Sequence, residues 1–224
     1  MASVPGFKGV RYGAATVEIS EGWWVTGNQY LNLSRSFSLS FVGGHPQYSE
    51  ALATTEVWNG TNWLSHDPLP RPMAGHCMVK INSTHVFLTH AQETYIYSKD
   101  TGFVKMQDMI RYRHEPTCGL HDNLVWAAGG HNEKESSEYF SLETLTWTEG
   151  PSITFESGNG KFQTPGKIVT WGKRTYWIES QNIWELVNTG ESSSWEWVKV
   201  GQTEYTKTDF QVFIITSDDC TSWE

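Results

Sequence analysis

Histidine and cysteine occur close together at two places in the chain, as His76-Cys77 and as His114 followed by Cys118. Imidazole and thiolate are ligands that zinc prefers, so both pairs could contribute to a metal or redox site. The alternatives are packing within a strand, which we favour, and a disulfide between Cys77 and Cys118. The chain has 3 cysteines, so any pairing leaves one over. We expect neither a metal nor a cofactor.

Four basic residues form a second candidate group, because they lie where successive repeat units are expected to begin: Arg71, Arg111, Arg113 and His114. In a chain with a net charge of −9 they could line a locally positive pocket for an anionic or polar ligand. Alternatively, the arginine that opens each unit is part of the repeat and bridges neighbouring units. We favour this alternative and keep the four as candidate partner-binding residues.

Catalytic motifs are missing from the sequence. It contains no nucleophile elbow, no phosphate-binding glycine loop and no His-Glu-x-x-His. The adjacent carboxylates of Asp218 and Asp219 could bind a cation, but a solvated turn explains them better. We therefore favour a binding protein over an enzyme.

The net charge and the glycosylation sequons limit the classes of binding partner and indicate the cellular compartment. The acidic balance disfavours nucleic acid, which is bound mainly through Lys and Arg contacts to phosphate. No stretch approaches the roughly 20 apolar residues that a membrane helix needs. Three Asn-x-Ser/Thr sequons, at Asn32, Asn59 and Asn82, fall in expected loops or turns. Together with the low charged content of 18%, they favour a secreted glycoprotein.

The elements that must position these residues are strands. Short β-branched and aromatic runs alternate with turn residues, including 20 glycines, and this pattern is typical of sandwiches, barrels and propellers. The 12 Trp, 10 Phe and 9 Tyr residues also require a substantial packed core. We therefore predict an all-β fold.

Three features recur in the same order four times along the chain. Each unit has an apolar strand, then a second strand rich in aromatic residues or glutamate, then a turn followed by an aromatic residue. The closing aromatic residues are Trp63, Phe103, Trp147 and Trp195, at steps of 40, 44 and 48 residues. A single small sheet buries one face at most, so stacked neighbours must bury the rest. We predict that these four aromatic side chains are equivalent and mostly buried.

This order of features resembles the Kelch repeat. Gly129-Gly130 followed by His131 matches its glycine pair, and Pro68-Leu69-Pro70-Arg71 matches its exit. The resemblance covers about residues 11–200, and the unit 111–151 carries every feature. It implies a single Kelch-type β-propeller domain over 1–224. Its four-stranded blades would lie at about 11–68, 69–110, 111–153 and 154–201, with 202–224 as a closing or partial blade.

The segment 28–50 departs most from the repeat. We predict that it projects from one face and dominates partner contact, because insertions in repeat proteins map to loops on one face. Its apolar residues include Tyr30, Phe37, Phe41 and Tyr48, which would form an exposed interaction patch. The alternative is that the segment folds back as an ordinary strand of the first blade.

By analogy with the fold, we expect a non-catalytic, extracellular binding module that recognises a protein or a glycan through loops on one face. One competing hypothesis is a propeller enzyme with a metal or polar site at the mouth of the channel. Another is a structural protein that forms homo-oligomers through exposed propeller edges.

Overall fold

The structure is a computed structural model that describes residues 17–19, 22–24, 40–42, 51–58, 61–154, 166–179, 181–190 and 194–203. Every regular element within these ranges is a β-strand, and the strands form antiparallel sheets. The prediction of an all-β fold is therefore confirmed. None of the described residues belongs to a helix that is long and apolar enough to cross a membrane.

Three of the sheets are meanders of four strands in which each strand pairs with the next along the chain. The second sheet contains β6 (Cys77–Lys80), β7 (His85–His90), β8 (Glu93–Ser98) and β9 (Gly102–Lys105). The third contains β10 (Thr117–His121), β11 (Leu124–Ala128), β12 (Ser137–Ser141) and β13 (Thr146–Glu149). The fourth contains β14 (Lys167–Trp171), β15 (Arg174–Glu179), β16 (Asn182–Asn188) and β17 (Trp195–Gln202).

The first sheet has five strands, because a segment of the predicted insertion joins it. Its strands are β1 (Val17–Ile19), β2 (Gly22–Trp24), β3 (Ser40–Val42), β4 (Thr55–Trp58) and β5 (Trp63–His66). One edge of β4 pairs with both β2 and β3, and the other edge pairs with β5. Ser40–Val42 is therefore a strand of this sheet, so the prediction that 28–50 projects from one face is wrong for these three residues; the rest of that segment lies outside the described residues. Phe41 pairs with Glu56 here, while Tyr30, Phe37 and Tyr48 lie outside the described residues.

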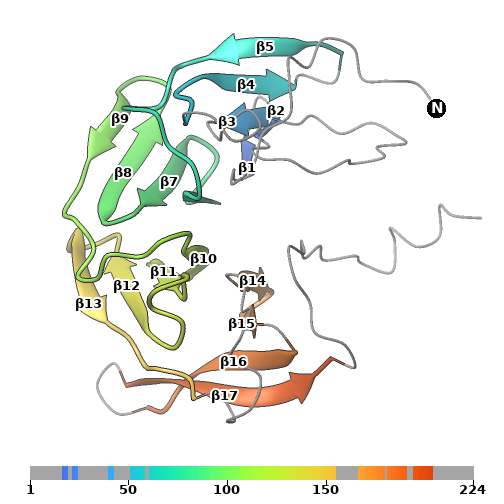
Figure 1. Cartoon of the computed structure of the whole chain (residues 1–224), viewed down its shortest axis with the longest axis vertical. Helices are drawn as coiled ribbons and strands as arrows, with labels where there is room; N and C mark the ends of the chain where they lie inside the picture. Colours follow the sequence, from blue (N-terminus) through green and yellow to red (C-terminus); the bar gives the residue numbers. More distant parts are fainter. Residues whose placement is uncertain are drawn as a thin grey trace, which may run out of the picture.

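The four sheets follow one another in chain order around an arc (Figure 1). Their first strands are neighbours, since β10 contacts both β6 and β14, and β6 contacts β1. This arrangement is compatible with a propeller-like all-β fold. It also brings the segments that precede these first strands close together, which matters for the candidate site.

The core lies between neighbouring sheets and is built from aromatic side chains. Phe87 of the second sheet packs with Phe140 and Trp147 of the third. In the same way, Trp126 of the third sheet packs with Trp197 of the fourth, which also contacts Trp177. Each interface thus buries the face that a single sheet would leave in water.

Trp147 and Trp197 occupy equivalent positions, which corrects one predicted residue. The Trp147 Nε1–H donates to Thr94 Oγ1 at 3.1 Å, and the Trp197 Nε1–H donates to Ser137 Oγ at 3.1 Å. Both acceptors lie at the start of the third strand of the preceding sheet. Trp195 lies two residues earlier on β17, where its ring contacts the His121 and Trp126 rings, so its equivalence to Trp147 was a wrong prediction.

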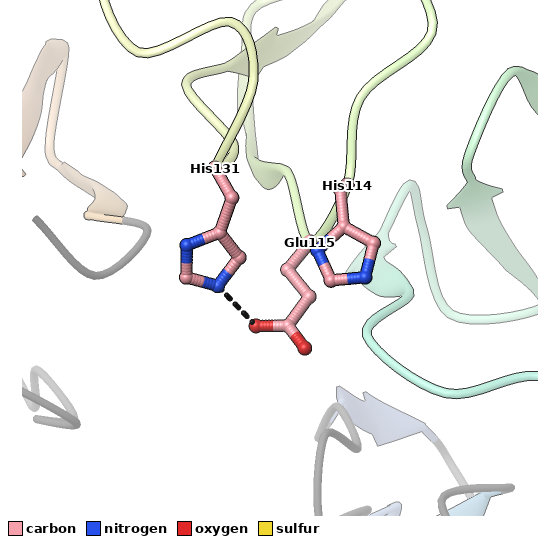
Figure 2. A group of neighbouring side chains, drawn as sticks. All are labelled: His114, Glu115 and His131. Atoms are coloured by element: carbon pink, nitrogen blue, oxygen red, sulfur yellow. Dashed lines mark hydrogen bonds and ion pairs between the residues drawn. The ribbon is translucent and has the colours of Figure 1, made fainter.

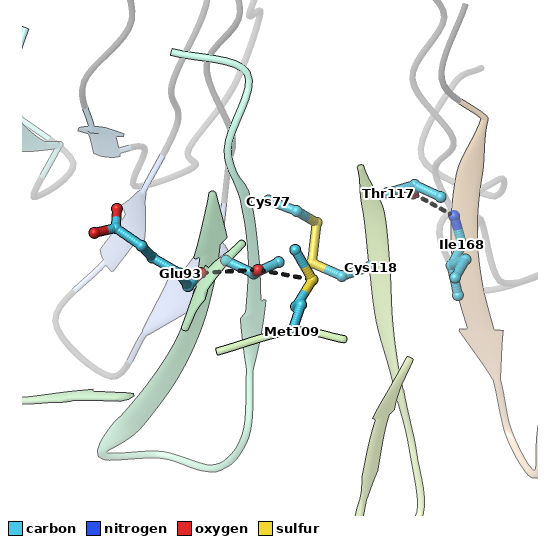
Figure 3. Close-up of a disulfide and its surroundings, with 7 residues drawn as sticks. Cys77, Glu93, Met109, Thr117, Cys118 and Ile168 are labelled. Atoms are coloured by element: carbon cyan, nitrogen blue, oxygen red, sulfur yellow. Dashed lines mark hydrogen bonds between the residues drawn. A yellow bond between two sulfur atoms is a disulfide. The ribbon is translucent and has the colours of Figure 1, made fainter. Parts of the chain in front are cut away.

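A disulfide joins the first strands of the second and third sheets (Figure 3). It links Cys77 on β6 to Cys118 on β10, with a Cα–Cα distance of 5.9 Å. On the other side of β10, the Ile168 amide of β14 donates to Thr117 Oγ1 at 2.9 Å. Because both sulfur atoms are used in the disulfide, they are not available as thiolate ligands for a metal.

Candidate functional site

One end of the second and third sheets carries most of the polar side chains that the sequence singles out. Neighbouring strands are antiparallel, so the segment before a first strand and the connection between strands two and three emerge at the same end of a sheet. We call this end the loop face and define it as residues 71–76, 90–93, 110–116 and 129–136. The Arg113 amide donates to the Ala91 carbonyl at 2.9 Å and thereby links the loops of the two sheets.

Arg71 connects the two loops of the second sheet. Its Nε donates to Glu93 Oε2 at 2.7 Å, and its Nη2 lies 3.1 Å from His90 Nδ1. Burial, followed by the positive charge of Arg71, lowers the pKa of His90. Partial burial tends to raise the pKa of Glu93, but the hydrogen bond and charge of Arg71 bring it below its usual value.

Arg111 makes the corresponding contacts in the third sheet. Its Nη1 lies 3.5 Å from Glu133 Oε2, and its Nη2 donates to Glu149 Oε1 at 3.1 Å. The carboxylates beside Arg71 and Arg111 offset the positive charges, so the two arginines do not form the locally positive pocket considered above. Each of these ion pairs also lies within one repeat unit, so none of them bridges neighbouring units.

Arg113 is fully buried and supports the loop face from beneath. Its Nε donates to Glu138 Oε1 at 2.8 Å, and both side chains are 0% exposed. Its Nη1 donates to the carbonyls of Gly129 and Ser136, both at 3.0 Å, which fixes both ends of the loop between β11 and β12. Burial lowers the pKa of Arg113, and the neighbouring Glu138 opposes this. Arg113 therefore has a structural role, and its prediction as a partner-binding residue is wrong.

His114, Glu115 and His131 come together at the surface of the loop face (Figure 2). His131 Nε2 lies 3.1 Å from Glu115 Oε2, and the two imidazole rings are 5.3 Å apart between centroids. One donor atom from each residue lies within 4.8 Å of the other two. His114 and Glu115 come from the segment before β10, and His131 comes from the loop after β11. Two imidazoles and a carboxylate are suited to binding a divalent transition metal.

Backbone contacts hold these two loops together. The His131 amide donates to the His114 carbonyl at 2.9 Å. Asn132 completes the connection, since its Oδ1 accepts from the His114 amide at 2.7 Å and its Nδ2 donates to the Tyr112 carbonyl at 2.7 Å. The positions of the two histidines are thus set by main-chain hydrogen bonds.

His114 was predicted from the sequence to be a site residue, whereas Glu115, His131 and Asn132 were not. The adjacent His114-Glu115 and the His131-Asn132 pair after Gly129-Gly130 were the available signals. Neither pair forms a recognised motif, because 16 residues separate Glu115 from His131 and the fold alone brings them together.

The opposite end of the sheets carries Asn82. This residue is exposed in the turn between β6 and β7. Its Oδ1 accepts hydrogen bonds from the Thr84 amide at 2.9 Å and the Thr84 hydroxyl at 3.0 Å. It borders an open depression that His85 and Asn123 also line. The other two sequon residues, Asn32 and Asn59, lie outside the described residues.

The fold and the site together define an all-β protein of antiparallel sheets with an ordered, polar loop face. No protein-family model and no curated protein sequence matches the chain. The functional proposal therefore depends on the geometry of the chain itself.

Proposed function

We propose that this chain is a non-catalytic binding module of the Kelch-type β-propeller family that recognises a protein or a glycan through its loop face. The observation that carries the proposal is a set of exposed side chains on loops that a buried ion pair and main-chain hydrogen bonds hold together. Tyr112 is 54% exposed and Ile110 is 45% exposed on the segment that also carries His114. Aromatic side chains beside polar groups are typical of binding surfaces.

The base beneath this surface favours recognition by a preformed site. The buried pair of Arg113 and Glu138 anchors both loops, since Glu138 Oε2 also accepts from the Ile110 amide at 2.7 Å. Binding to loops that are already ordered costs less conformational entropy than binding to loops that must become ordered. Exposed side chains at the loop face therefore need little rearrangement to contact a partner.

Two features support an extracellular location. A disulfide such as Cys77–Cys118 persists in oxidising compartments and is rare in the cytosol. The Asn82 sequon lies in an exposed turn, where a glycan could be attached. Because Asn82 lies at the opposite end of the sheets, a glycan there would leave the loop face open to a partner.

A second candidate function is an enzyme with a metal site at the same face. The cluster of His114, Glu115 and His131 favours it, because three protein ligands leave a coordination position open for a substrate. We rank it second because the sequence contains no recognised catalytic motif.

The test is binding of the purified chain to a glycan array and to an array of secreted proteins. The loop-face variant is Tyr112→Ala, and the matched control is Trp171→Ala, an exposed aromatic residue at the opposite end of the fourth sheet. We expect Tyr112→Ala to lose most of the binding of the wild-type chain and Trp171→Ala to keep it. The reverse pattern, or equal loss in both variants, would contradict binding through the loop face.

A further inference from the structure

We propose that His114, Glu115 and His131 form a binding site for one divalent transition-metal ion of the zinc class. Two ligands of a tetrahedral Zn²⁺ site lie about 3.3 Å apart when each is about 2.0–2.1 Å from the ion. The distance of 3.1 Å between His131 Nε2 and Glu115 Oε2 already matches this separation. Since all three donor atoms lie within 4.8 Å of one another, a small rotation of the exposed His114 side chain completes the set.

Main-chain hydrogen bonds hold together the two segments that carry these ligands. Hydrogen bonds from the His131 amide to the His114 carbonyl and from the His114 amide to Asn132 fix the spacing of the two histidines. Gly130 permits this close approach, because a Cβ atom at this position would lie 3.0 Å from the His114 carbonyl oxygen. Asn132 therefore acts as a positioning residue that holds the ligands without contacting the ion.

Glu115 is positioned by a separate contact with the second sheet. A Cβ atom on Gly75 would lie 2.3 Å from Glu115 Cγ, so only a glycine leaves room for this side chain. Gly75 also has a φ of +69°, a conformation that glycine adopts without strain. The Glu115 side chain thus lies between the second and third sheets, with its carboxylate near the two imidazoles.

The donor set selects the class of ion. Ca²⁺ and Mg²⁺ prefer oxygen ligands, and Ca²⁺ takes six or more of them. Two imidazole nitrogens and one carboxylate oxygen instead suit Zn²⁺ and its neighbours among the divalent transition metals. The fourth position would face solvent, where a water molecule or a donor group of a partner could occupy it. Metal binding itself does not depend on the proposed partner.

The experiment is isothermal titration calorimetry of the full-length chain, free of any histidine tag, with ZnCl₂, CaCl₂ or MgCl₂. We expect one Zn²⁺ per chain and no comparable binding of Ca²⁺ or Mg²⁺. His114→Ala, His131→Ala and Glu115→Gln should each weaken Zn²⁺ binding by about tenfold or more, and Asn132→Ala by about tenfold. The matched control is His85→Ala, an imidazole at the opposite end of the sheets, which should bind as the wild type does.

Two results would overturn the proposal. One is unchanged Zn²⁺ affinity in Glu115→Gln and His131→Ala, and the other is binding of Ca²⁺ as tight as that of Zn²⁺. Glu115→Gln keeps the size of the side chain, so it stays informative even where a histidine variant fails to fold. Visible absorption of bound Co²⁺ gives a second measurement, because its d–d bands report the ligands directly and should disappear in His131→Ala. A Tyr112→Ala variant that binds Zn²⁺ normally but no longer binds a partner would separate this inference from the proposed function.

Discussion

Replacing Trp147 with alanine tests how the sheets are held together. The Trp147 side chain is 7% exposed and packs against the Phe87 ring at 5.9 Å and the Phe140 ring at 5.4 Å, between centroids. Truncation of a buried Trp to Ala costs about 3–5 kcal/mol through lost burial and the cavity that remains. The loss of the indole N–H also removes hydrogen bonds to Thr94 Oγ1 and the Gln107 carbonyl, which places the expected cost in the upper part of this range.

The assay is equilibrium unfolding in urea followed by far-UV circular dichroism, which does not depend on the removed fluorophore. The matched control is Trp171→Ala, since Trp171 is 63% exposed and its loss should change the free energy of unfolding by less than about 0.5 kcal/mol. Trp197→Ala should cost about as much as Trp147→Ala, and Trp195→Ala should cost less. A cost below about 1 kcal/mol for Trp147→Ala, or equal costs for Trp147→Ala and Trp171→Ala, would refute the reasoning.

Three further predictions concern pH, the disulfide and glycosylation. Burial raises the pKa of Glu179 to about 8, and this effect outweighs the Gly166 amide and the Lys134 charge, which lower the pKa. The folded chain therefore keeps a proton on Glu179 that the unfolded chain releases near pH 4.5. The proton on Glu179 therefore stabilises the folded chain fully below about pH 4.5, and this stabilisation is lost as the pH rises through about 8. Between these pH values the unfolding midpoint should fall less steeply with pH in Glu179→Gln than in the wild type. The same pH dependence in both proteins would contradict a raised pKa for Glu179. Replacing both Cys77 and Cys118 with alanine should cost about 3–4 kcal/mol, because the disulfide spans 41 residues, and an unchanged urea midpoint would contradict this expectation. Protein from a eukaryotic secretory host should carry a glycan at Asn82 and lose mass on glycosidase treatment. Thr84→Ala should abolish this glycan, because it removes the third residue of the sequon, and the control Ser83→Ala should keep it. An unmodified Asn82 would count against secretion.

The order of the strands was largely predictable from local pattern. The sequence pattern predicts a strand rich in aromatic residues or glutamate before each closing turn, and β8, β12 and β16, each the third strand of its sheet, are such strands. Such runs are predictable because turn residues and alternating apolar side chains act over a few neighbours. The same local pattern could not choose between Trp195 and Trp197, since both point to the same side of one strand and only the neighbouring sheet distinguishes them.

The candidate site, unlike the order of the strands, was hardly predictable from local sequence pattern. Arg71, Arg111 and Arg113 looked alike in the sequence, yet the fold leaves the side chains of Arg71 and Arg111 43% and 41% exposed and buries Arg113 completely against Glu138, which lies 25 residues away. Arginine is usually exposed, because a buried charge needs a partner of opposite charge. Arg113 can be buried only because Glu138, on a strand distant in sequence, supplies that carboxylate. Phe41 was predicted to lie in a projecting segment, but its strand β3 pairs with β4. An unpaired strand edge has free N–H and C=O groups, and such an edge of β4 can accept a further strand.

Residue types and their spacing were enough to predict the all-β class, the repeated order of strands and turns, and the aromatic content that fills the space between sheets. These follow from residue type and spacing along a short stretch of chain. Three other features depend on the packing of the sheets: the contact of Cys77 with Cys118, the equivalence of Trp197 to Trp147, and the contact of Glu115 with His131. The physical reason is that each of these contacts joins separate strands or loops, and the distance between them is set by how the sheets pack and not by the residues next to them in sequence.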